Sequence, residues 1–177
     1  QILPDDVAGD KEYRRVCREY ELKSKNSVEL LQAYLDKYPD SRYTDRVRSL
    51  IASVYFEEGK YKEAIAMFRA CDLEALPDAE RDDCAMRLAT SYLKEGNLRD
   101  ASVWFLLLKE VSPRYQSDAT YNLAYIDYVE KRYNKALDAF LSLKDDAVYS
   151  SLVPYYIGEI YLLQGNYEQA RSVAERY

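Results

Sequence analysis

The sequence repeats one frame of small and aromatic residues along most of its length. In the clearest copy, the small residues Ala52 and Ala64 stand twelve positions apart, Tyr55 and Phe68 follow them, and Gly59 lies between. Small residues let two helices approach closely, and glycine can take the left-handed conformation that ends a helix. This stretch therefore predicts two short amphipathic helices joined by a tight turn.

Three further copies keep the same gap of twelve positions between two small residues. These pairs are Ala89 and Ala101, Ala124 and Ala136, and Gly158 and Ala170. Counted from Ala64, the second small residues follow one another at spacings of 37, 35 and 34 residues. A period of this length indicates a helical repeat array, in which each unit buries its apolar face by stacking on its neighbours.

The frame resembles the tetratricopeptide repeat (TPR) family over about residues 44–177. The shared features are a small residue followed by Tyr in the first helix, a turn glycine, an A-x3-F pattern in the second helix and a closing proline. One copy carries them all, as Ala89, Tyr92, Gly96, Ala101, Phe105 and Pro113. The resemblance implies an all-α fold, a right-handed α-α superhelix (TPR solenoid) of about five antiparallel helix pairs.

Two copies depart from the family pattern at single positions. The third has Asp127 in place of the tyrosine and Lys131 in place of the turn glycine, and the fourth has Ala174 in place of the phenylalanine. These departures weaken individual repeats and leave the fold prediction unchanged.

The expected organisation is a single array behind a short lead-in. Residues 1–9 show no periodicity and predict a poorly ordered lead-in, while residues 10–177 predict one TPR-like array. Its repeats are expected at about 10–40 (degenerate), 44–76, 81–113, 116–148 and 150–177 (truncated). Asn26 and Glu29 predict a capping box at the start of the second helix.

The composition argues against catalysis and against a metal or cofactor. The sequence contains no histidine, which removes the commonest general base and most zinc sites. Cys17, Cys71 and Cys84 lack the spacing of a metal site. Cys71 and Cys84 flank a junction between repeats and form either a disulfide or two buried thiols. We therefore expect no enzyme, no metal and no cofactor.

Charge and hydropathy point to protein partners. The net charge of −6 argues against non-specific binding to nucleic acid or anionic membrane. No stretch approaches the ~20 apolar residues of a membrane span, so direct membrane insertion is not expected. The last repeat could also support self-association through Val173 and Tyr177.

The resemblance implies that the first helix of each pair lines a concave face. Tyrosine, with 19 copies, is concentrated on the C-terminal half of that face. The residues expected to bind a peptide there are Arg87, Tyr121, Asn122, Tyr125, Tyr128, Tyr155 and Tyr156. An equally open interpretation is that Tyr121, Tyr125 and Tyr155 pack between neighbouring helices. A carboxylate clamp of the chaperone-binding type is not expected, because only Arg87 and Asn122 have suitable side chains.

The expected function is a non-catalytic scaffold that binds a peptide or protein segment on its concave face. The alternative is a structural or oligomerisation segment of a longer TPR protein. The segment from Tyr38 to Ser41 also resembles repeats of bacterial cell-envelope TPR proteins, such as the periplasmic partner of the Tol–Pal system and the TPR lipoprotein of outer-membrane assembly. That likeness implies a periplasmic or outer-membrane-associated bacterial protein, with the cytoplasm as the alternative.

Overall fold

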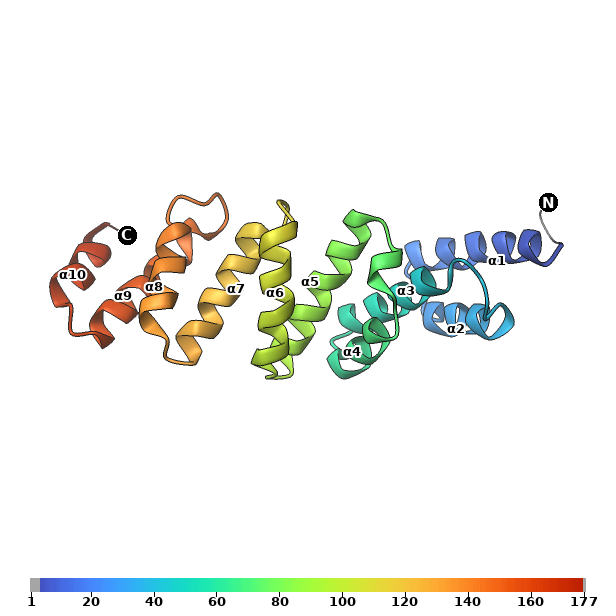
Figure 1. Ribbon diagram of the computed structural model, residues 1–177, viewed down its shortest axis with the longest axis horizontal. Helices are drawn as coiled ribbons and strands as arrows, with labels where there is room; N and C mark the ends of the chain where they lie inside the picture. The colour runs from blue at the N-terminus through green and yellow to red at the C-terminus, as the bar shows by residue number, and fades with distance from the viewer. Residues whose placement is uncertain (1–3, 177) are drawn as a thin grey trace. The chain divides into compact units, whose positions relative to one another are not determined.

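The computed structural model describes residues 4–176, which form helices joined by short connections and no strand (Figure 1). The α-helices are α1 (Pro4–Glu21), α2 (Ser27–Lys37), α3 (Thr44–Glu57), α4 (Tyr61–Arg69), α5 (Asp78–Lys94), α6 (Leu98–Val111), α7 (Gln116–Val129), α8 (Tyr133–Ser142), α9 (Val153–Leu163) and α10 (Tyr167–Arg176). Two short 3₁₀ turns, η1 (Leu73–Ala75) and η2 (Tyr149–Ser151), precede α5 and α9. The helix pairs that the repeat frame predicts are confirmed.

The helices form two compact units, α1–α5 and α6–α10, which meet in sequence at Asn97 and Leu98. Within each unit, every helix packs against the next one along the chain, and α3 also packs against α5. The boundary falls at the turn inside the predicted repeat 81–113. The expectation that residues 10–177 form a single array stays a prediction.

The turn inside each helix pair requires a left-handed residue, as the sequence predicts. Gly59, Gly96 and Gly165 have φ angles of 75°, 78° and 73°. Lys131, which replaces the glycine between α7 and α8, adopts the same conformation with a φ of 65°. Residues other than glycine pay roughly 1–2 kcal/mol in this region because Cβ approaches the next carbonyl oxygen. The turn between α7 and α8 therefore keeps the same geometry, although lysine is less favourable than glycine in this conformation.

The small and aromatic positions of the frame form the core of each unit. Ala64 and Phe68 are buried in the first unit, and Ala136 and Phe140 are buried in the second. Phe140 belongs to a cluster that includes Val153 and Ile160 of the next pair. Burying a large apolar side chain contributes roughly 1.5–3 kcal/mol. The hydrophobic face of the α7–α8 pair is thus covered by α9 of the pair that follows it.

The start of α1 differs from the prediction. Residues 1–3 of the expected lead-in lie outside the described residues, but α1 begins at Pro4, six positions before Asp10. Gly9 is buried with its Cα beside Tyr38, since a Cβ built on it would lie 3.6 Å from the Tyr38 ring. Asp10 also accepts a hydrogen bond from Arg42 at 3.0 Å. Tertiary contacts of this kind stabilise a helix where the local sequence shows no periodicity.

The predicted capping box at Asn26 is not formed. Asn26 precedes α2, but its side chain makes no capping hydrogen bond. Its φ of −101° and ψ of 20° lie outside the extended region from which a capping side chain reaches the first-turn amides. The prediction was correct about where the helix starts and wrong about its capping.

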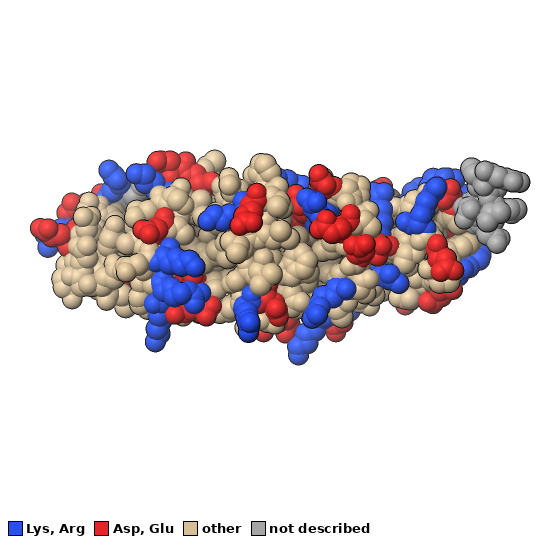
Figure 2. Space-filling model, in the orientation of Figure 1, with Lys and Arg blue, Asp and Glu red and all other residues tan. Residues whose placement is uncertain are grey.

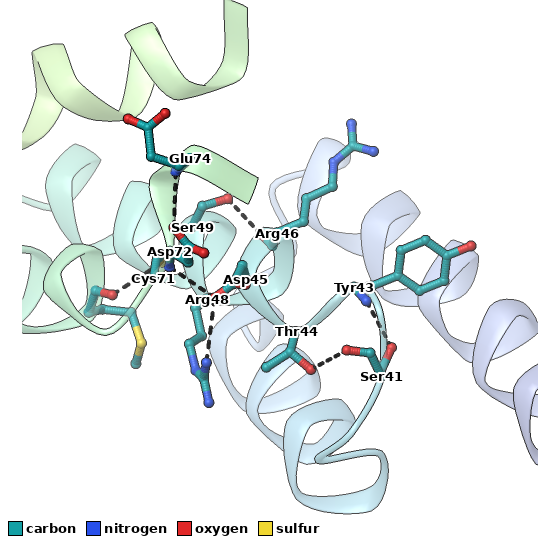
Figure 3. A network of polar contacts seen from close by, with 11 residues as sticks. Ser41, Tyr43, Thr44, Asp45, Arg46, Arg48, Ser49, Cys71, Asp72 and Glu74 are labelled. Atoms are coloured by element: carbon teal, nitrogen blue, oxygen red, sulfur yellow. Dashed lines mark hydrogen bonds and ion pairs between the residues drawn. The ribbon is translucent and has the colours of Figure 1, made fainter. Parts of the chain in front are cut away.

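Side chains at the start of α3 hold the long connection between α4 and α5 (Figure 3). The Asp45 carboxylate accepts a hydrogen bond from the backbone N–H of Asp72 at 3.0 Å, and the Arg48 guanidinium lies 3.6 Å from the same oxygen. Asp72 in turn accepts from the backbone N–H of Glu74 at 3.2 Å, which starts η1. These bonds fix the segment that leads into α5.

At the other end of the chain, α10 runs to Arg176, and Tyr177 lies outside the described residues. Across residues 4–176, none of the helices has both the length and the apolar character needed to cross a bilayer.

The close packing of α4 leads to a first prediction. Ala64 is completely buried, whereas Ala66 on the same helix is exposed. Ala64→Leu should lower the free energy of unfolding by ~1–3 kcal/mol because the extra methylenes overpack the core. Ala66→Leu is the matched control and should change it by less than ~0.5 kcal/mol. Urea unfolding measures both, and equal effects would contradict the close approach of the helices at Ala64.

The left-handed turn between α7 and α8 leads to a second prediction. Lys131→Gly and Lys131→Ala remove the same charged side chain, but only the glycine also removes Cβ. Since Lys131 has a φ of 65°, Lys131→Gly should be more stable than Lys131→Ala by ~1 kcal/mol. Thermal and urea unfolding of the two variants give the comparison. A Lys131→Ala protein as stable as Lys131→Gly would mean that the turn carries no such strain.

Candidate functional site

Side chains of α1, α3 and α5, the first helices of three successive pairs, line a cavity of about 520 Å³. We name it the first-helix cavity. Each helix contributes side chains at helical spacing. From α1 these are Tyr13, Arg14, Cys17, Arg18, Tyr20 and Glu21, from α3 Arg46, Ser49, Leu50 and Ser53, and from α5 Glu80, Asp83, Cys84 and Arg87.

Two polar contacts join α3 and α5 at this cavity. The Arg46 guanidinium lies 2.6 Å from a carboxylate oxygen of Glu80, and the Arg87 Nη1 donates to the Ser53 hydroxyl at 2.9 Å. Ser53 then donates to the backbone carbonyl of Ser49 at 2.8 Å within α3. Among the described residues, no ion pair to a carboxylate involves Arg87. Its guanidinium is thus held by one neutral hydrogen bond and keeps further N–H donors for a ligand.

Burial favours the protonated thiol form of the cysteines near this cavity. Burial raises the pKa of the Cys84 thiol to about 11 and also raises the pKa of Cys17. Cys71 lies in the connection after α4, and burial raises its pKa to about 12. Cys71 and Cys84 are free thiols in this structure. Because the thiolate is the nucleophile and the metal ligand, these groups do not supply either chemistry near pH 7.

The second unit brings the predicted tyrosines together around Tyr156 of α9. Tyr156 stacks on Phe140 of α8, with ring centroids 4.8 Å apart and planes 6° from parallel. Four more predicted residues meet the Tyr156 ring edge to face at centroid distances of 5.3–6.2 Å, namely Tyr121, Tyr125, Tyr128 and Tyr155. We name this group the tyrosine cluster. Such edge-to-face pairs add to packing stability.

Tyr121 is fixed in the cluster by a residue that the sequence interpretation missed. Its ring stacks on Tyr149 at a centroid distance of 4.4 Å, and the Tyr149 hydroxyl donates to the Asp118 carboxylate. Tyr149 lies in η2, one residue before the start that we predicted for the last repeat. No helical periodicity marks a residue in such a turn, so only the fold shows its contact with Tyr121.

The predicted site residues therefore fall into different environments. Tyr155 has 69% of its surface exposed, whereas Tyr121, Tyr125, Tyr128 and Tyr156 are partly buried. The Asn122 amide donates to the Asp118 carbonyl of its own helix at 2.8 Å. Arg87 belongs to the other unit and lies at the first-helix cavity. The packing interpretation thus describes Tyr121 well, and the ligand interpretation remains open for Tyr155 and Arg87.

The sequence interpretation also missed most of the cavity on α1. In the sequence, Tyr13, Cys17 and Tyr20 have the spacing of one apolar helix face, and Tyr13 is buried in the structure. The same helix presents Arg14 and Arg18 to the cavity, next to that face. Arg14 and Arg18 each follow a residue of this apolar face directly in the sequence. That pattern could have indicated a polar border to the face.

A metal site is not apparent in the part of the chain that the structure describes. No group of three or more Asp, Glu or Cys side chains among residues 4–176 is placed to hold a metal ion.

The burial of Tyr121 leads to a third prediction. Burial raises its pKa to about 12, above the value of about 10 for an exposed or unfolded tyrosine. The folded state therefore holds the proton more tightly, and this contribution to stability is complete below about pH 10 and is lost as the pH rises towards 12. Tyr121→Phe should make stability fall less steeply over that range. Urea unfolding between pH 9 and 11, in ~0.5-unit steps, checks it, and equal slopes for both proteins would contradict the burial of the hydroxyl.

Comparisons with known proteins agree with the helix pairs. Tetratricopeptide repeat models match residues 46–73 and residues 155–177. No curated protein matches the chain in sequence. The likeness of Tyr38–Ser41 to cell-envelope repeats stays a prediction.

Similar solved structures extend the fold assignment over nearly the whole chain. MamA superposes with a TM-score of 0.67 at 16% identity, covering 93% of this chain and 89% of the other. Two structures of the nearly identical TPR-like repeats of a putative kinesin light chain from Podosopora anserina give TM-scores of 0.61 and 0.63 at 14% and 13% identity. They cover 99% and 98% of this chain and 95% and 94% of theirs. Identities this low show the fold alone, and the predicted all-α repeat fold is confirmed. Together with the two matched repeats, this fold supports the resemblance of the chain to the tetratricopeptide repeat family.

Proposed function

We propose that this chain is a protein-binding scaffold that holds a partner segment in the first-helix cavity, with Arg87 as the anchor. TPR repeats generally mediate protein–protein interaction, and their fold is typically non-catalytic. The observation that carries the more specific proposal is the cavity itself, because side chains of three successive first helices line it.

The chemistry of the cavity favours a peptide over a small metabolite. The cavity is lined by three helices. It combines aromatic surface from Tyr20 with hydrogen-bonding groups from α3 and α5. An extended peptide needs both, because its backbone carbonyls seek donors while its side chains seek apolar contact. Arg87 supplies donors that no carboxylate of the described residues occupies.

Arg87 also suggests which side chain the partner presents. A guanidinium matches a carboxylate with two parallel hydrogen bonds, and such charge-assisted bonds are stronger than neutral ones. Arg14 and Arg18 add positive charge on α1, while Glu80 is already paired with Arg46. We therefore propose a segment with an acidic side chain that lies against Arg87.

The tyrosine cluster has a smaller part in this proposal. Most of its rings pack on one another, so they stabilise α7–α9 and offer only their edges to a partner. Tyr155 is the exception, since its exposed ring could stack on an apolar side chain.

Arginine substitution tests the anchor. Peptides are selected on the wild-type chain from a random dodecapeptide phage library, and their affinities are measured by fluorescence anisotropy. Arg87→Ala should weaken binding at least about tenfold, because a charge-assisted contact contributes roughly 1.5–3 kcal/mol. Arg69→Ala, which removes an exposed arginine of α4 outside the cavity, should change the affinity less than about twofold.

Two results would contradict the proposal. One is a set of selected peptides that bind Arg87→Ala and Arg69→Ala equally well. The other is binding that is lost in Tyr155→Ala but kept in Arg87→Ala, since this would move the site to the tyrosine cluster.

A further inference from the structure

The second unit has a groove on its second helices that the proposed peptide site does not use. It encloses about 940 Å³, with α6 and α8 as walls and α7 as the floor. We name it the second-helix groove. It is lined by Arg99, Ser102, Val103, Leu106 and Lys109 of α6, Gln116, Thr120, Leu123 and Asp127 of α7, Glu130 and Arg132 of the turn, and Lys135, Asp138, Ala139 and Ser142 of α8.

The α6 wall of this groove is apolar and open to solvent. Val103 and Leu106 have 61% and 51% of their surfaces exposed, and Leu123 continues the apolar surface onto α7. Val103 and Leu106 are three residues apart and therefore lie on the same side of α6. Figure 2 shows mainly uncharged surface over α6 and α7, with charged side chains of both signs at its border. An apolar surface of this kind, rimmed by polar residues, is typical of a binding site.

The two buried polar side chains on the floor, Thr120 and Asp127, already have hydrogen-bond partners. The Thr120 hydroxyl donates to the Gln116 carbonyl at 2.8 Å within α7. The buried Asp127 carboxylate pairs with Arg132 at 2.7 Å, and Arg132 also lies 3.2 Å from Glu130. Because Thr120 and Asp127 keep these partners when they are covered, an apolar ligand stripe can lie directly on them.

The shape of the groove fits a helix better than an extended strand. Both walls are helices that pack on α7, and side chains line them at intervals of three and four residues. A third helix laid between them would make the side-chain contacts by which helices normally pack. Strand addition needs a sheet edge, which residues 4–176 do not provide.

The charges at the rim select an acidic helix. Arg99, Lys109 and Lys135 line the groove and form no ion pair among the described residues, while Arg132 is occupied by two carboxylates. Asp138 is the one lining carboxylate that lacks such a pair in the described part of the chain. This excess of positive charge stands out in a chain with a net charge of −6. We propose that the second-helix groove binds an amphipathic helix of a partner protein, with an apolar stripe flanked by Asp or Glu.

The proposal is tested with two synthetic amphipathic peptides of about five helical turns. Both carry a leucine stripe, flanked by glutamate in one peptide and by lysine in the other, and fluorescence anisotropy measures their binding to the whole chain. The glutamate peptide should bind at least about tenfold more tightly than the lysine peptide at low salt, and the difference should shrink as salt screens the charges.

Matched variants locate the binding. Leu106→Asp should weaken the glutamate peptide at least about tenfold. Leu162→Asp on α9, where the leucine is also 51% exposed, should change its affinity less than about twofold. The double variant Lys109→Glu and Lys135→Glu should weaken it more than Lys144→Glu, which lies outside the groove. Circular dichroism melting confirms that each variant is folded.

Three outcomes would overturn the proposal. The peptides could bind equally well or not at all, or Leu162→Asp could weaken binding as much as Leu106→Asp. Sedimentation could instead show a wild-type dimer that Leu106→Asp dissociates, which would make a second copy of this chain the occupant.

Discussion

The close approach of two helices through small residues is the constraint on which this structure depends. Ala52 and Ala64 are completely buried, and a larger side chain at either position would separate α3 from α4. The left-handed turn at Gly59 reverses the chain, so that α4 runs back close to α3. A single pair cannot bury its own apolar face, so the next pair must cover it. Fold and repetition follow from the same geometric requirement.

Surface function arises from the residues that vary within this constant frame. On the first helices, the variable positions hold Arg87 in one unit and Tyr155 in the other, so equivalent helix faces offer different chemistry. On the second helices, α6 exposes Val103 and Leu106 at the positions where α4 exposes Ala66 and Arg69. The proposed binding surfaces are therefore departures from the repeat, while the residues that define the family are buried.

The fold could be predicted from the sequence because its determinants are local and recur. Small residues, turn glycines and helical spacing were enough to predict a helix pair over residues 81–113, whose second helix is α6 (Leu98–Val111). The start of α1 could not be predicted, because it depends on the contact between Gly9 and Tyr38, which are distant in sequence. The site was predicted only in part for the same reason. The tyrosines could be named as candidates from their residue type. Their mutual packing and the cavity beside Arg87 could not be predicted, because both arise from contacts between separate helices.

The central claim is that partner segments bind on the face of α1, α3 and α5. Nuclear magnetic resonance of the labelled chain, titrated with a peptide selected on it, tests this claim most directly. Shift changes should concentrate at Tyr20, Ser53 and Arg87, and they should be saturable. Changes confined to Tyr125 and Tyr155, with none around Arg87, would contradict the account and assign binding to the tyrosine cluster.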